Sequence, residues 1–169
     1  MHPDHVAELV AVQVDALEEA VAQLDLRVCR IELRDRTDIY IRFTSTTKRA
    51  LDVPGLGAVR LGDTEVEEEF VLYLACADFD SQPPLVDLLD AEEEPLPPER
   101  WPRDERRHGI VRGHHIYGDR KFFCRPGTRQ FHTHRQHEDQ PWDAVREQMT
   151  VDGIAVGILR DFRERWTIR

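Results

Sequence analysis

One segment of fifteen residues, from Cys124 to Glu138, gathers a thiol, three imidazoles and a carboxylate. In an extended strand the side chains of residues i and i+2 share a face, so His132 and His134 would point the same way. Cys124 upstream and Glu138 downstream would then close a four-ligand shell of the kind that a divalent transition metal prefers. The spacing predicts a metal site formed by Cys124, His132, His134 and Glu138.

The donor types favour Zn²⁺, although another divalent transition metal would fit the same donors. Six of the eight histidines lie within residues 108–137, which favours a site over a chance cluster. The fourth ligand stays open, because His137 or His114 could replace Glu138 and give a more nitrogen-rich shell. Four protein ligands would make the site structural. Three would leave a position for water and permit metal-dependent hydrolysis, with Glu138 as general base.

The three cysteines differ in their surroundings. An odd number of cysteines, with no secretory signal at the start of the sequence, argues against a disulfide framework. Cys29 and Cys76 lie in apolar strand-like segments, and we expect both to be small buried hydrophobes. Cys124 has polar, histidine-rich neighbours instead, so we expect this cysteine to be the one with a chemical role.

The net charge of −10 argues against a general nucleic-acid binder, whose affinity would depend on neutralising phosphates. No apolar run approaches the length of a membrane span, so we expect no membrane partner and a cytoplasmic location. Arg125 and Arg129 lie close to Cys124. We expect them to form salt bridges with the acidic segment 92–105 rather than to lower the pKa of the thiol.

Hydrophobic periodicity predicts the elements that must position this chemistry. Apolar residues at steps of three and four predict a helix that starts at an Asp4 N-cap, and a second amphipathic helix that starts at a Thr150 N-cap. Between these helices the pattern alternates, as in antiparallel strands. The expected elements are a helix over 4–25, a hairpin over 29–43, a short extra strand over 58–61, a central strand over 69–77, a strand over 85–89, an acidic surface loop over 91–107 and a helix after Thr150.

The order of these elements predicts a single α+β domain over residues 1–169. Its expected parts are the N-terminal helix (4–25), an antiparallel four-stranded meander (27–90), a long irregular loop region with the metal cluster (91–141) and a C-terminal helical part (142–166).

Several motifs make this order resemble the ubiquitin-conjugating (E2, or UBC/RWD-like) fold over residues 4–166. Residues 79–84, Phe-Asp-Ser-Gln-Pro-Pro, stand where E2 proteins carry a Tyr-Pro-x-x-Pro-Pro turn. Residues 114–116, His-His-Ile, begin ten residues before Cys124, which is the interval between the His-Pro-Asn tripeptide of an E2 and its thioester cysteine. Trp142 and the apolar helix after it resemble the E2 tryptophan and the helix that follows.

Together with the histidine-rich segment, this pattern resembles a bacterial family predicted to bind metal through a Cys, a Glu and two His, and associated with ubiquitin-like conjugation operons. The resemblance implies a ligand set of Cys124, Glu138, His132 and His134. It also implies an accessory or adaptor function in a ubiquitin-like modification system. The implied partners are an E1-like enzyme, an E2 or the ubiquitin-like protein itself.

The resemblance leaves enzymatic activity open. As an active conjugating enzyme, the protein would carry the modifier as a thioester on Cys124, with His114 or His132 as the base. Ile116, however, replaces the Asn that helps to stabilise the oxyanion in E2 enzymes, and such a hydrogen bond is worth ~3–4 kcal/mol. A metal-dependent hydrolase is the third alternative.

Overall fold

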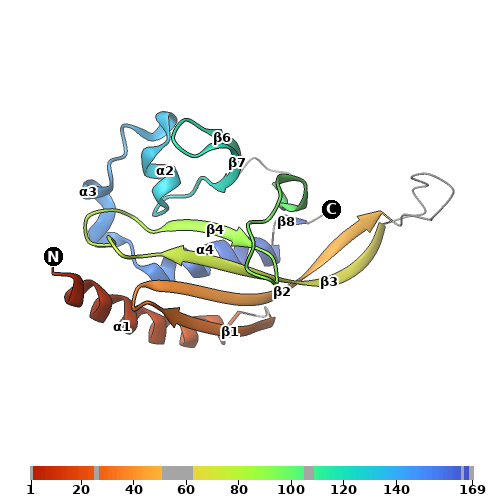
Figure 1. The fold of residues 1–169 in the computed structure, drawn as a ribbon, viewed down its shortest axis with the longest axis horizontal. Coiled ribbons are helices and arrows are strands. Elements are labelled where there is room, and N and C mark those ends of the chain that lie inside the picture. Colours follow the sequence, from red (N-terminus) through yellow and green to blue (C-terminus); the bar gives the residue numbers. More distant parts are fainter. Residues whose placement is uncertain (1, 25–26, 51–62, 105–108, 165, 168–169) are drawn as a thin grey trace.

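A four-stranded antiparallel sheet forms the centre of the fold, with strands in the order β1-β2-β3-β4 (Figure 1). The computed structural model describes residues 2–24, 27–50, 63–104, 109–164 and 166–167. The sheet consists of β1 (Arg27–Arg34), β2 (Asp38–Ala50), β3 (Asp63–Ala75) and β4 (Leu85–Leu89). Helices α1 (Pro3–Val21) and α4 (Val151–Glu164) pack against each other and against one face of this sheet.

The core lies between the sheet and these two helices. Alternate residues of β2 and β3 point to the same face, and the register pairs Ile39 with Leu74, Ile41 with Leu72 and Phe43 with Phe70. All six side chains are fully buried, as are Val10 and Leu17 of α1 and Ile158 and Leu159 of α4. Full burial of one such side chain contributes about 1.5–3 kcal/mol, so this layer holds the helices and the sheet together.

The α+β class, the N-terminal helix, the antiparallel sheet and the C-terminal helix agree with the sequence-based prediction. Cys76 is fully buried, as expected, whereas the side chain of Cys29 and residues 58–61 lie outside the described residues. The N-cap of α1 is His2 rather than Asp4, and the His2 side chain accepts a hydrogen bond from the Asp4 amide. Pro3 explains the earlier start, because its fixed φ suits the first helical position.

The region between β4 and α4 contains short elements that the sequence did not predict. They are the 3₁₀ turns η1 (Pro98–Arg100), η2 (Arg135–His137) and η3 (Arg146–Gln148), the strands β5 (Arg103–Asp104), β6 (Ile110–His114) and β7 (Gly118–Phe123), and the helices α2 (Arg129–Thr133) and α3 (Trp142–Val145). Strands β6 and β7 form a hairpin, and β5 pairs with β8 (Trp166–Thr167). Figure 1 shows β6, β7 and α2 together above β4, so the cysteine and histidine segment lies beside the sheet.

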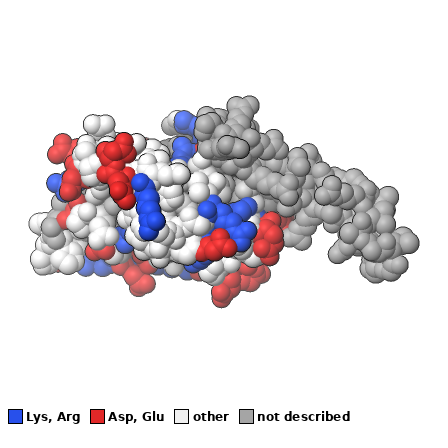
Figure 2. All heavy atoms as spheres, turned by 90° about the horizontal axis from the view of Figure 1, so that it is seen from above, with Lys and Arg blue, Asp and Glu red and all other residues white. Residues whose placement is uncertain are grey.

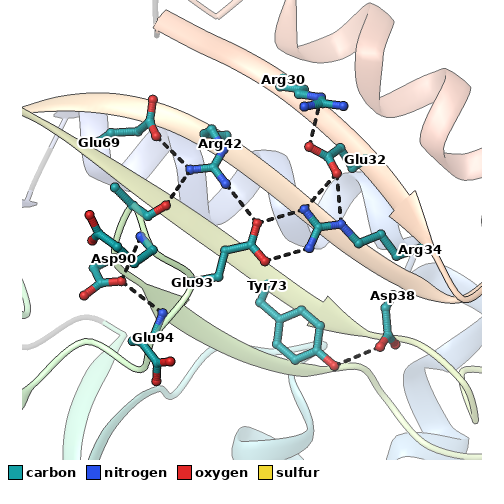
Figure 3. A network of polar contacts seen from close by, with 12 residues as sticks. Arg30, Glu32, Arg34, Asp38, Arg42, Glu69, Tyr73, Asp90, Glu93 and Glu94 are labelled. Atoms are coloured by element: carbon teal, nitrogen blue, oxygen red, sulfur yellow. Dashed lines mark hydrogen bonds and ion pairs between the residues drawn. The ribbon is translucent and has the colours of Figure 1, made fainter.

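A network of ion pairs fastens the turn after β4 to the outer face of the sheet (Figure 3). Glu93 receives two hydrogen bonds from Arg34 of β1, at 2.6 and 2.8 Å, and one from Arg42 of β2, at 2.9 Å. Arg34 also pairs with Glu32, and Arg42 with Glu69. Glu93 has φ 66°, in the left-handed region, so the ion pairs hold an uncommon backbone conformation.

Charged side chains of both signs occur on the described surface. Seen from above Figure 1, acidic and basic side chains form small separate groups between uncharged atoms (Figure 2). The described part of this face therefore carries no continuous basic surface of the kind that phosphate binding requires. No helix among the described residues is long and apolar enough to span a membrane.

Candidate metal centre

Three side chains with metal-ligating atoms meet beside the β6–β7 hairpin. Cys124, His134 and His137 each offer one such atom, and these atoms all lie within 4.8 Å of one another. The sulfur of Cys124 lies 3.4 Å from Nε2 of His137. Cys124 directly follows β7, His134 follows α2, and His137 ends η2. All three are half-buried, so the group is close to the surface.

The turn between Cys124 and α2 folds the chain back on itself. The fully buried hydroxyl of Thr128 donates to the carbonyl of Phe123 at 2.8 Å. The same hydroxyl accepts a hydrogen bond from the amide of Phe131, so Thr128 is the N-cap of α2. Gly127 has φ 92°, and a Cβ at this position would lie 2.7 Å from the side chain of Ile154. This turn therefore requires glycine, and it returns the chain so that His134 and His137 meet Cys124.

Buried polar groups fix α2 against the edge of the sheet. The Gln130 side chain accepts a hydrogen bond from the amide of Val86 in β4 and donates one to the Val86 carbonyl. His114 is buried; its Nε2 lies 3.0 Å from the Gln130 carbonyl, and its Nδ1 accepts a hydrogen bond from the Ile116 amide. These partners place the proton on Nε2. Both ring nitrogens of His114 are thus engaged, and the ring supports α2 rather than offering a lone pair to a metal.

His132 also has partners on both ring nitrogens. Its Nδ1 lies 2.7 Å from the Gln140 carbonyl, and its Nε2 accepts a hydrogen bond from the Gly127 amide at 3.1 Å. Burial lowers the pKa of His132, which favours the neutral ring that this pair of bonds requires. His132 stays outside the group of three, where it closes the loop that carries them.

The strand-like interpretation of His132 and His134 is corrected by this structure. His132 lies in helix α2, and the chain leaves the helix at His134, with φ −79° and ψ 136°. The two rings therefore lie in different surroundings: His132 packs against Trp142, whereas His134 packs against Phe122 and His137. A two-residue spacing brings rings together only in an extended strand.

Of the predicted ligands, the structure brings together Cys124, His134 and the alternate His137. Glu138 is exposed and does not join the group. The signal in the sequence was the spacing of His134 and His137, because residues three apart lie on the same side of a helical turn. The ring of His137 stacks on Phe131, with the centroids 3.8 Å apart, and this contact fixes its orientation.

The thiol of Cys124 is protonated at neutral pH when no metal is bound. Burial raises its pKa to about 11. A divalent metal would reverse this preference, since a coordinated thiol loses its proton.

The arginines near Cys124 have partners other than the acidic segment 92–105. Arg125 forms an ion pair with the buried Asp161 of α4. Arg129 donates from Nε to the carbonyl of Pro83 at 2.9 Å. Both anchor the loop to the fold on either side of Gly127, and the predicted bridges to 92–105 are not among their described contacts.

The donor set fits zinc. One thiolate and two imidazoles are ligands that Zn²⁺ accepts, and bond lengths of ~2.0–2.3 Å place tetrahedral ligand atoms about 3–4 Å apart. The three atoms already lie within 4.8 Å, so small side-chain adjustments would close the site. Among the residues that the structure describes, no fourth Cys, His, Asp or Glu belongs to the group. His108 lies outside the described residues.

Comparison of the chain with protein-family models and with curated protein sequences finds no match. We therefore infer this metal centre from the geometry of its own residues.

Proposed function

We propose that the protein binds one zinc ion through Cys124, His134 and His137. The observation that carries this proposal is the convergence within 4.8 Å of three ligand atoms, one from the end of β7 and two from the turn after α2. A bound zinc ion would link the end of β7 to the α2–η2 segment through its bonds to these three side chains. The protein residues hold this geometry through the Thr128 cap and the Gln130 contact with β4.

The geometry favours a metal ligand over a thioester nucleophile at Cys124. A thiol with a pKa of about 11 contains little of the nucleophilic thiolate at neutral pH. His114, the expected assisting residue, has both ring nitrogens engaged by Gln130 and Ile116. The imidazole next to the thiol is that of His137, which also belongs to the metal group.

We further propose that the protein acts as an accessory or adaptor in a ubiquitin-like modification system. Support comes from the order of elements, because α1, the four-stranded meander, Cys124 and α4 follow one another as in the E2-like fold that the sequence motifs resemble. The partners proposed are an E1-like enzyme, an E2 or a ubiquitin-like protein. In this proposal the cysteine at the E2 nucleophile position serves as a metal ligand.

Metal analysis of protein purified without a histidine tag tests the first proposal. We expect stoichiometric zinc in the unaltered protein, and its loss in a Cys124→Ala variant together with a lower Tm. His115→Ala is the matched control, because His115 is an exposed imidazole outside the group. Metal-free protein that forms a reducible adduct with a ubiquitin-like protein would contradict the proposal and support the conjugating enzyme.

A further inference from the structure

We infer that the metal centre of Cys124, His134 and His137 keeps a fourth coordination position for a compact anion from outside the chain, such as a carboxylate. This inference rests on the proposed zinc site and names the class of ligand that the bound zinc would accept. Catalytic zinc sites commonly have three protein ligands and one exchangeable position, whereas structural sites have four protein ligands.

Two neighbouring imidazoles, those of His132 and His114, are engaged elsewhere. His132 bonds to Gly127 and Gln140, and His114 bonds to Gln130 and Ile116. If either ring turned to bind the metal, a backbone amide or carbonyl would lose its hydrogen-bond partner. At the buried His114 the unpaired backbone group would also stay out of contact with water, which is unfavourable. His132 and His114 are therefore held out of the coordination sphere, and His115 is not part of the group.

The carboxylate of Glu138 is directed away from the group by the local backbone. Glu138 directly follows His137 at the end of the turn η2 and has helical φ and ψ. Adjacent residues of a helical turn do not face each other. Because the side chain of His137 points toward Cys124, the exposed side chain of Glu138 projects to a different side.

Charge and exposure indicate the class of ligand. One thiolate cancels one of the two positive charges of Zn²⁺, and neutral imidazoles cancel none, so the centre keeps a net charge of about +1. All three ligand residues are half-buried, so the group lies near the surface. A small anionic oxygen or nitrogen donor complements both features, whereas a neutral apolar ligand complements neither.

Cobalt substitution of the full chain tests this inference. A thiolate-to-cobalt charge-transfer band reports coordination by Cys124, and the visible ligand-field bands report the fourth ligand. We expect sodium azide and sodium acetate to shift the ligand-field bands saturably while the charge-transfer band persists. If that band is absent from the unaltered protein, the proposed zinc site itself is wrong. If the band is present and neither anion shifts the visible bands, the open position is wrong and the zinc site stands.

Two variants test whether the chain itself fills the fourth position. Glu138→Gln removes the carboxylate that the sequence predicted as a ligand, and His108→Ala removes an imidazole that lies outside the described residues. We expect both variants to respond to azide as the unaltered protein does. An azide response that appears only after one of these substitutions would show that this residue occupies the position, and would overturn the inference.

Discussion

The sulfur of Cys124 lies 3.4 Å from Nε2 of His137, thirteen residues further along the chain. The contact joins the end of β7 to the turn η2, and His134 brings its own ligand atom to the same point. The Gly127–Thr128 turn and the Gln130 anchor account for this meeting. The function proposed for the protein depends on whether this group holds a metal.

Substitution of a proposed ligand should weaken zinc binding strongly. We expect Cys124→Ala and His137→Ala each to lower the affinity for zinc by more than about 100-fold. Loss of a residue that only hydrogen-bonds to a ligand typically lowers metal affinity by ~10–100-fold, and loss of a ligand itself should cost more. Competition with a chromophoric chelator measures the change. His115→Ala should bind zinc like the unaltered protein, and equal losses in all three variants would contradict the assignment.

His132 should prove structural rather than metal-binding. His132→Ala removes the bonds to the Gly127 amide and the Gln140 carbonyl, so we expect the free energy of unfolding to fall by ~1–3 kcal/mol. Zinc stoichiometry should remain one under conditions where the variant is folded. Urea unfolding and metal analysis of the same preparation provide the two readouts. A stable but zinc-free His132→Ala protein would favour the ligand set that the family resemblance implies.

Zinc binding should release about one proton at neutral pH. The metal-free Cys124 holds its proton because burial raises its pKa to about 11, while burial lowers the pKa of His134 and keeps that ring neutral. The affinity should therefore rise by about tenfold for each pH unit, since the ligand must be deprotonated. Calorimetry in buffers of different ionisation enthalpy counts the protons. Binding without proton release would mean that Cys124 is not a ligand.

The sequence predicted the sheet well because alternation of apolar residues is a direct consequence of strand geometry. Ile39, Ile41 and Phe43 alternate with polar residues, and all three are fully buried on the helix-covered face. Thr150 was also correctly expected as a helix start, and its hydroxyl accepts a hydrogen bond from the Gly153 amide. These signals are local, so they can be recognised without knowledge of the tertiary fold.

The site was harder to predict because its geometry depends on short elements. Helix α2 has only five residues, too few for periodicity to identify it. The His132 and His134 spacing suggests one face if the segment is a strand, but the helix places the rings apart. His137 reaches the group because its ring stacks on Phe131 and because the chain turns at Gly127. These contacts form only in the folded chain. The family identity stays a prediction.

The Glu93 network should stabilise the fold at neutral pH and lose its effect in acid. The hydrogen bonds from Arg34, together with the charge of Arg42, lower the pKa of Glu93 below its usual value. A carboxyl group whose pKa is lowered by folding adds stability above its unfolded pKa of about 4.3, and this stability is lost as the pH falls through the lower folded pKa. Glu93→Gln should therefore be less stable than the unaltered protein at pH ~7 and comparable at strongly acidic pH.

Urea unfolding across this pH range measures the difference, and added salt should reduce it partly at neutral pH, because these ion pairs are partly exposed and salt screens them. Glu92→Gln is the matched control, since Glu92 is the exposed neighbour of Glu93. A stability difference between the unaltered protein and Glu93→Gln that does not change with pH would show that the charge of Glu93 is not the cause.

X-ray absorption spectroscopy at the zinc edge identifies the atoms bound to the metal, and so tests directly whether Cys124, His134 and His137 are its ligands. We expect one sulfur at ~2.3 Å and two imidazole nitrogens at ~2.0–2.1 Å, with one further light atom bound to the zinc. The sulfur should vanish in Cys124→Ala. A zinc shell without sulfur in the unaltered protein, or with more than two imidazoles, would contradict the assignment to Cys124, His134 and His137.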